Sequence, residues 1–159
     1  MQNEGRRLIL SSGSPRRREL LARMGYAFEI CTPDVDEHVP GQACDVVRTL
    51  AIRKGRAAAE HFSDGVIIAS DTLVSLDGAP LGKPEDAADA RRMLRALSGR
   101  EHEVFSGVCL VDAATGREEV RVDRTGVRGK ILNHLTEDEI AKLRHSAECL
   151  RTVIGNVEI

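Results

Sequence analysis

Residues 8–17 read Leu-Ile-Leu-Ser-Ser-Gly-Ser-Pro-Arg-Arg, an apolar run followed by a hydroxyl-rich turn and two arginines. The pattern predicts a strand, a tight turn and a helix start, because Ser14 is a good N-cap residue and Pro15 suits the first helical position. Arg16 and Arg17 then fall in the first helical turn, where the helix dipole favours anions over cations. A bound anion would resolve this conflict, so the turn predicts a phosphate site. The alternative is an ordinary helix cap followed by two solvated arginines.

Length and composition limit the classes of protein that the chain can belong to. Its 159 residues predict one domain, and a hydrophobic content of 42% is enough for a core. The net charge of −2 argues against bulk electrostatic binding to nucleic acid or an anionic membrane, so we expect neither as a partner. The first 30 residues show no signal-peptide pattern, and no apolar stretch approaches the roughly 20 residues that span a bilayer.

The cysteines give an expectation about compartment. The four of them, at positions 31, 44, 109 and 149, form no Cys-x-x-Cys spacing, and no histidine cluster accompanies them. This argues against a zinc site and against a disulfide framework. Small buried thiols in a reducing compartment remain the better interpretation, and we expect a cytoplasmic protein.

Strand-like and helix-like segments alternate along the chain. Strands are predicted at 7–11, 27–31, 66–69, 104–111 and 119–123, and helices at 15–24, 42–61, 84–97 and from a capping box at 136–139. In the first helix, Leu20 and Leu21 are expected to face inward, with Gly25 as the stop. The third strand is expected to end at residues 70–72, before a hairpin through Asp77 and Gly78. The alternation predicts an α/β fold, and the hairpins favour a mixed sheet.

Acidic residues supply candidates for catalysis and metal binding. Asp71 follows a strongly apolar strand, and α/β sheets place ligands at the carboxyl ends of their strands. A carboxylate there can hold a metal or act as a base, although an Asx turn is the simpler interpretation. Glu37 ends an acidic group with Asp34 and Asp36, and Mg²⁺ prefers one or two carboxylates plus phosphate oxygens. A solvated acidic loop is the alternative.

Two lysines complete the candidates. Lys54 lies in the second predicted helix and Lys83 at a loop-to-helix junction, and each can meet a phosphate as a point charge. Either one alone is more often a solvated side chain. Together with Arg16, Arg17, Glu37 and Asp71, the two lysines suit a metal–polyphosphate ligand. His102, near the start of a strand, is interpreted as structural.

Six ordered blocks resemble the Maf family of nucleoside triphosphate pyrophosphatases. They are Leu-Ile-Leu-Ser-Ser-Gly-Ser-Pro-Arg-Arg-Arg-Glu-Leu-Leu at 8–21, Asp-Val-Asp-Glu at 34–37, Leu-Ala-Ile-Arg-Lys at 50–54, Ala-Ser-Asp-Thr-Leu-Val at 69–74, Leu-Gly-Lys-Pro at 81–84 and Leu-Ser-Gly-Arg-Glu-His at 97–102. The match to the family is good over residues 6–111, weak over 112–142 and absent over 143–159. The resemblance implies a single Maf-like domain spanning 1–159.

The resemblance implies a fold, a reaction and a site. It implies a mixed sheet with flanking helices and a central cleft, and hydrolysis of a nucleoside triphosphate to the monophosphate and pyrophosphate with Mg²⁺ or Mn²⁺. Within the family, the sequence looks most like the branch that acts on dTTP and UTP, and the resemblance is compatible with a homodimer. Asp71 matches the proton acceptor, and Arg16 and Thr72 match positions linked to base choice. The remaining pocket positions are matched by Ser12, Ser14, Arg17, Lys54 and Lys83 for substrate and by Glu37, with Asp71, for the metal.

The last part of the chain departs from the family pattern. The family's Ala-Gly-x-Tyr and Ile-Gln-Gly block is not found after residue 142, so the C-terminal strands are expected to be partly missing. This leaves two functional hypotheses: an active nucleoside triphosphate pyrophosphatase, and a catalytically impaired nucleotide-binding or regulatory protein.

Overall fold

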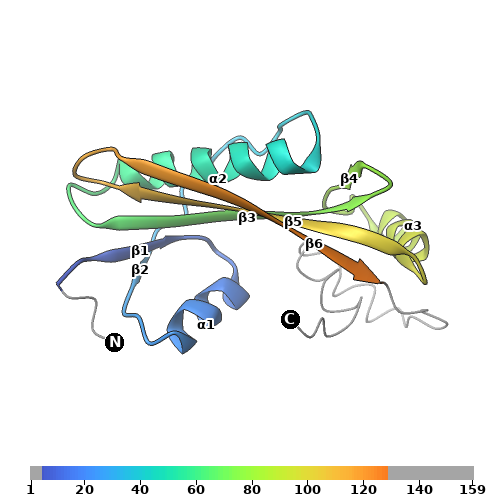
Figure 1. Ribbon diagram of the computed structural model, residues 1–159, viewed down its shortest axis with the longest axis horizontal. Coiled ribbons are helices and arrows are strands. Elements are labelled where there is room, and N and C mark those ends of the chain that lie inside the picture. Colours follow the sequence, from blue (N-terminus) through green and yellow to red (C-terminus); the bar gives the residue numbers. More distant parts are fainter. Residues whose placement is uncertain (1–4, 129–159) are drawn as a thin grey trace. The chain divides into compact units, whose positions relative to one another are not determined.

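The computed structural model describes residues 5–128, which form three helices and six strands (Figure 1). In chain order these are β1 (Leu8–Ser11), α1 (Pro15–Arg23), β2 (Glu29–Ile30), α2 (Ala43–Ala59), β3 (Val66–Leu76), β4 (Ala79–Leu81), α3 (Ala87–Leu97), β5 (Glu101–Asp112) and β6 (Glu118–Arg128). The predicted segments are all present within this range, with shifted ends. The α/β class is therefore confirmed.

The strands form one mixed sheet. Its order is β2-β1-β3-β5-β6, and β4 pairs with β3 outside this path. β1 runs parallel to β2 and to β3, with Leu8 opposite Val66 and Ser11 opposite Ala69. β4 runs antiparallel to β3. The prediction of a mixed sheet is confirmed, whereas the central cleft implied by the resemblance stays a prediction.

The chain divides into two compact units, each with a buried cluster of its own. Within the described residues, the first unit comprises 5–71 and Ser106–Val122, and the second comprises Thr72–Phe105 and 123–128. The first cluster consists of Ile9, Ala51, Ala58, Ile67, Ala69, Cys109 and Val111. The second consists of Val74, Leu76, Met93, Leu94, Leu97 and Val104. The aliphatic composition of both clusters follows from a chain with only 3% aromatic residues.

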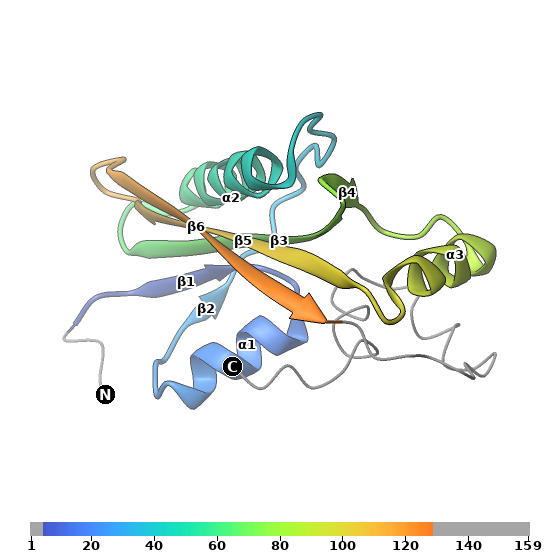
Figure 2. The same ribbon diagram turned by 45° about the vertical axis from the view of Figure 1, so that its right-hand side comes forward.

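In the first unit, α2 lies along one face of the strands (Figures 1 and 2). Seven of its residues are buried, at the helical spacing that the sequence shows. Glycines permit the close approach: a Cβ on Gly107 of β5 would lie 2.4 Å from the carbonyl oxygen of Val47. A Cβ on Gly55 would lie 3.0 Å from Val111 Cγ2. The helix is therefore held by close packing.

α1, the other helix of this unit, contains no buried residue. Leu20 is 50% exposed, so the expectation that it faces inward was wrong, and Leu21 is half-buried. Helical spacing predicts which side chains share a face, and it does not predict whether a neighbour covers that face. The predicted stop is confirmed, because Gly25 follows the helix with φ of 81°.

β3 is longer than predicted. It runs without a break from Val66 to Leu76, so Asp71 lies within a strand and the expected end at residues 70–72 was wrong. The polar side chains of this stretch resemble a turn in sequence, but pairing with β4 keeps the later half extended. The parallel pairing with β1 does end at Ala69, so Asp71 lies just beyond the paired carboxyl end of β1. The hairpin is confirmed, since Asp77 and Gly78 have φ of 52° and 80°.

The remaining predictions concern other parts of the chain. His102 in the second unit is 4% exposed, in agreement with a structural role, and burial lowers its pKa. The capping box at 136–139, Cys149 and the expected loss of C-terminal strands lie outside the described residues. No helix within residues 5–128 has the length and apolar character needed to cross a membrane.

Candidate active site

The turn between β1 and α1 is organised by serine hydroxyls. Ser12 Oγ accepts a hydrogen bond from the Ser14 N–H at 3.2 Å, and Ser14 Oγ accepts one from the Arg17 N–H at 3.4 Å. Ser14 is thus the N-cap, and Pro15 occupies the start of the helix as predicted. The first turn of α1 carries no acidic residue. An anion near this end of the helix therefore meets the positive end of the helix dipole.

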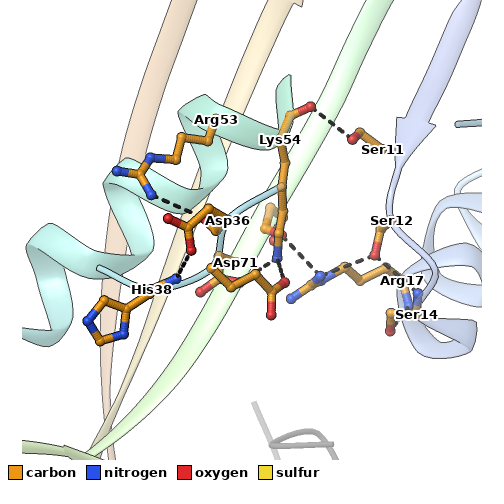
Figure 3. Close-up of polar contacts among 11 residues, drawn as sticks. Ser11, Ser12, Ser14, Arg17, Asp36, His38, Arg53, Lys54 and Asp71 are labelled. Atoms are coloured by element: carbon orange, nitrogen blue, oxygen red, sulfur yellow. Dashed lines mark hydrogen bonds and ion pairs between the residues drawn. The ribbon is translucent and has the colours of Figure 1, made fainter. Parts of the chain in front are cut away.

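Arg17 connects this turn to β3. Its guanidinium Nη1 donates to Ser12 Oγ at 3.1 Å and to the backbone carbonyl of Ser70 at 3.1 Å (Figure 3). Ser70 immediately precedes Asp71. These contacts hold a cationic side chain next to the segment of β3 that carries the candidate catalytic acid.

Lys54 lies between two carboxylates. Its Nζ is 2.9 Å from Asp71 Oδ1 and 2.9 Å from Glu37 Oε1. The side chains of Lys54 and Asp71 are only 17% and 15% exposed, whereas Glu37 is 49% exposed. Three elements supply this triad: α2, β3 and the loop before α2. Figure 3 shows Lys54 reaching from its helix to Asp71.

The charge state of Lys54 follows from two opposed effects. Burial is the larger single influence and lowers its pKa, because an ammonium loses hydration in the interior. The hydrogen bonds and charges of Asp71 and then Glu37 raise it, and together they prevail, so the pKa of Lys54 lies above its ordinary value. Lys54 is therefore a cation at neutral pH.

Further polar contacts fix the elements around the triad. Ser11 Oγ donates to the backbone carbonyl of Lys54 at 3.1 Å, joining β1 to α2. In the acidic loop, the His38 N–H donates to Asp36 Oδ1 at 2.9 Å, and Arg53 donates to the Asp36 carbonyl at 3.0 Å. Sequence reasoning missed the roles of Ser11, Ser70 and Arg53. Only Ser11 gave a signal, as a hydroxyl at the end of a strand.

The structure brings together six of the predicted site residues in the first unit. These are Ser12, Ser14, Arg17, Glu37, Lys54 and Asp71. Arg16 is exposed on α1. Thr72 follows Asp71 on β3, and Lys83 is exposed in the segment after β4. Both belong to the second unit. The participation of these three residues in the site stays a prediction.

A comparison with known protein families decides where the chain belongs. The family described as "Maf-like protein" matches residues 7–156, nearly the whole chain. The chain belongs to the Maf-like protein family. The resemblance seen in the ordered sequence blocks is thereby confirmed.

Three curated relatives of this Maf-like protein are named dTTP/UTP pyrophosphatase. The chain is 46% identical to the dTTP/UTP pyrophosphatase of Moorella thermoacetica, over 84% of this chain and 69% of that protein. It is 43% identical to the dTTP/UTP pyrophosphatase of Pelotomaculum thermopropionicum, over 79% of this chain and 67% of that protein. A third relative, the dTTP/UTP pyrophosphatase of Bacillus cereus strain AH820, is 41% identical over 85% of this chain and 69% of its own length.

The carboxylates of this Maf-like protein fit a divalent cation of the Mg²⁺ type. No group of three or more His, Cys, Asp or Glu side chains suited to a metal occurs within residues 5–128. Glu37 and Asp71 nevertheless converge on a single ammonium, which places one oxygen of each near a common point. Mg²⁺ usually takes one or two carboxylates and completes its shell with water and substrate phosphates. The donor set therefore suits a cation that arrives with a phosphate ligand.

Proposed function

We infer that this chain is a nucleoside triphosphate pyrophosphatase, which cleaves between the α and β phosphates to give a monophosphate and pyrophosphate. The observation that carries this inference is the Lys54–Asp71–Glu37 triad beside the Ser12–Arg17 turn. Cations for phosphate and carboxylates for water or metal lie within one unit. Relatives at 41–46% identity named dTTP/UTP pyrophosphatase support it, and make dTTP and UTP the first substrates to test.

Each side chain is assigned a task in this proposal. Arg17 and Lys54 bind phosphate oxygens, and Ser12 and Ser14 shape the turn that receives them. Asp71 orients the attacking water and accepts its proton as the water oxygen bonds to the α phosphorus and the bond to the pyrophosphate breaks. A triphosphate carries about four negative charges, so positioned cations lower the barrier by stabilising the leaving group.

A divalent cation, Mg²⁺ or Mn²⁺, is part of the proposal. Glu37 and Asp71 are the residues that would hold it. When bound, it would neutralise charge on the phosphate oxygens and on the departing pyrophosphate. The predicted roles of Arg16 and Thr72 in base choice and of Lys83 in phosphate binding belong to the same proposal, as does a homodimer. A cytoplasmic location is proposed with them, supported by three free cysteines within residues 5–128.

The test is a turnover panel with an acid variant as control. The protein is incubated with dTTP, UTP and modified nucleotides in Mg²⁺ or Mn²⁺, and both products are quantified. We expect equal amounts of monophosphate and pyrophosphate, and a fall of about 100-fold or more in Asp71→Asn. Circular dichroism must show that the variant is folded. Release no greater than that of Asp71→Asn would overturn the proposal, and a nucleotide-induced melting shift without turnover would favour the binding-only alternative.

A further inference from the structure

One ammonium lies where two candidate metal ligands meet. Lys54 Nζ is within 2.9 Å of an oxygen of both Glu37 and Asp71. A divalent cation held by the same two oxygens would lie about 2.0–2.1 Å from each in the case of Mg²⁺. The ammonium and the metal ion would then share one small region of space with like charge. Because the two like charges repel, binding of either one to these oxygens opposes binding of the other.

The ammonium of Lys54 lies at the end of a flexible four-carbon stem. Ser11 Oγ donates to the backbone carbonyl of Lys54, so rotation within the stem would move the ammonium while the backbone stays held. Ser11 is followed directly by Ser12, which belongs to the turn proposed to receive phosphate. A triphosphate in that turn offers the ammonium new anionic partners close to its anchored backbone.

We propose that Lys54 is a built-in counter-cation of the Glu37–Asp71 pair, which a divalent metal displaces only when a triphosphate is present to receive the ammonium. The proposal rests on the proposed function and adds an order of events to it. Metal alone binds weakly, because it must displace a paired ammonium. Metal and triphosphate bind cooperatively, and this coupling is reciprocal by thermodynamic necessity.

If the proposal holds, Lys54→Met raises the affinity for Mn²⁺ alone and lowers the affinity for a metal–nucleotide complex. Removing the ammonium takes away a positive charge that competes for the two carboxylates, so Mn²⁺ in nucleotide-free buffer is expected to bind about tenfold tighter than to the wild-type protein. Electron paramagnetic resonance measures this directly through the signal of free Mn²⁺. The Mg²⁺ complex of a dTTP analogue with NH in place of the α–β bridging oxygen is expected to bind about tenfold weaker, because a phosphate partner is lost.

Arg48→Met is the matched control. Arg48 lies on the same helix as Lys54, carries the same charge and is exposed. Both affinities are expected to stay within about twofold of wild type, because the loss of one exposed charge has a small, screened effect. An equal gain of Mn²⁺ affinity in Arg48→Met would overturn the proposal, since net charge would then explain it.

Other outcomes separate this proposal from a merely structural lysine and from the proposed function. A folded Lys54→Met protein that binds Mn²⁺ no tighter than wild type overturns it, and Lys54→Gln repeats the test if the methionine variant does not fold.

A check without variants is the melting temperature of the wild type. Mn²⁺ and the analogue together must raise this temperature by more than the sum of their separate shifts, and an additive result overturns the proposal. Pyrophosphate release by the wild type tests the proposed function alone, because the Mn²⁺ titration contains no nucleotide.

Discussion

The two helices of the first unit are held in place by different forces. α2 buries seven of its 17 residues and approaches β5 closely enough to require glycine at position 107. α1 buries none of its nine residues and is connected through hydrogen bonds of Ser14 and Arg17 at its first turn. Packing therefore fixes the helix that carries Lys54, and polar contacts fix the helix that carries Arg17. Substitutions in the two helices should consequently damage different properties.

The largest effect is expected where α2 meets β5. Gly107→Ala places a Cβ at 2.4 Å from the Val47 carbonyl oxygen and 2.7 Å from its carbon, and backbone atoms cannot move aside as a side chain can. We expect the free energy of unfolding to fall by about 3 kcal/mol or more, measured by urea denaturation. Gly126→Ala is the control, because nothing lies within 4 Å of a Cβ there. Equal losses in both variants would contradict the close contact.

The second effect concerns activity rather than stability. Arg17→Met removes the guanidinium that donates to Ser12 and to the Ser70 carbonyl. We expect kcat/KM for dTTP or UTP to fall about 100-fold, with a stability loss of about 1 kcal/mol or less. Arg18→Met, the same change one position along α1, should leave kcat/KM within about threefold of wild type, since an exposed cation acts through solvent. Equal losses of activity in the two variants would mean that the placement of Arg17 is unimportant.

A smaller effect is expected at the cap of α1. Ser14→Ala removes the oxygen that accepts from the Arg17 N–H. The expected loss is about 0.5–1 kcal/mol of unfolding free energy, measured by thermal and urea denaturation. Ser14→Thr keeps the oxygen and should recover most of the loss. If alanine proved as stable as serine, the capping bond would contribute nothing in solution.

The smallest effect tests whether α1 is truly uncovered. Leu20 is 50% exposed, so Leu20→Ala should change the free energy of unfolding by less than about 0.5 kcal/mol. Leu50 on α2 is 6% exposed, and Leu50→Ala should cost about 2–5 kcal/mol because it leaves a cavity. Both values come from urea denaturation. Similar costs at the two positions would remove the contrast between the helices.

The predictions from sequence succeeded where the signal was local. The cap at Ser14, the stop at Gly25 and the hairpin at Asp77 each depend on residues adjacent in the chain, and all three are present. The helix predicted at 42–61 is likewise present as α2, at Ala43–Ala59. These features require only backbone geometry and the preferences of single residues.

The errors came from contacts between distant segments. The end of β3 was misplaced because its later half is kept extended by β4, which the residues at 70–72 do not reveal. The exposure of Leu20 depends on what packs against α1. The sequence identified Lys54, Glu37 and Asp71 as candidates. It did not reveal that both carboxylates contact the Lys54 ammonium, because each lies 17 residues from Lys54 and in a different element.

The bond from Ser11 to the Lys54 carbonyl has a consequence for how the lysine is aimed. A hydroxyl that recognises one particular carbonyl opposes sliding of α2 along β1, and a slip of a single helical turn would carry the amine about 5.4 Å away from both acids. The place from which the Lys54 side chain extends is thus held by a serine that contacts only the backbone of the lysine. To move the ammonium, one would therefore change Ser11, which holds the helix in register, and keep the lysine.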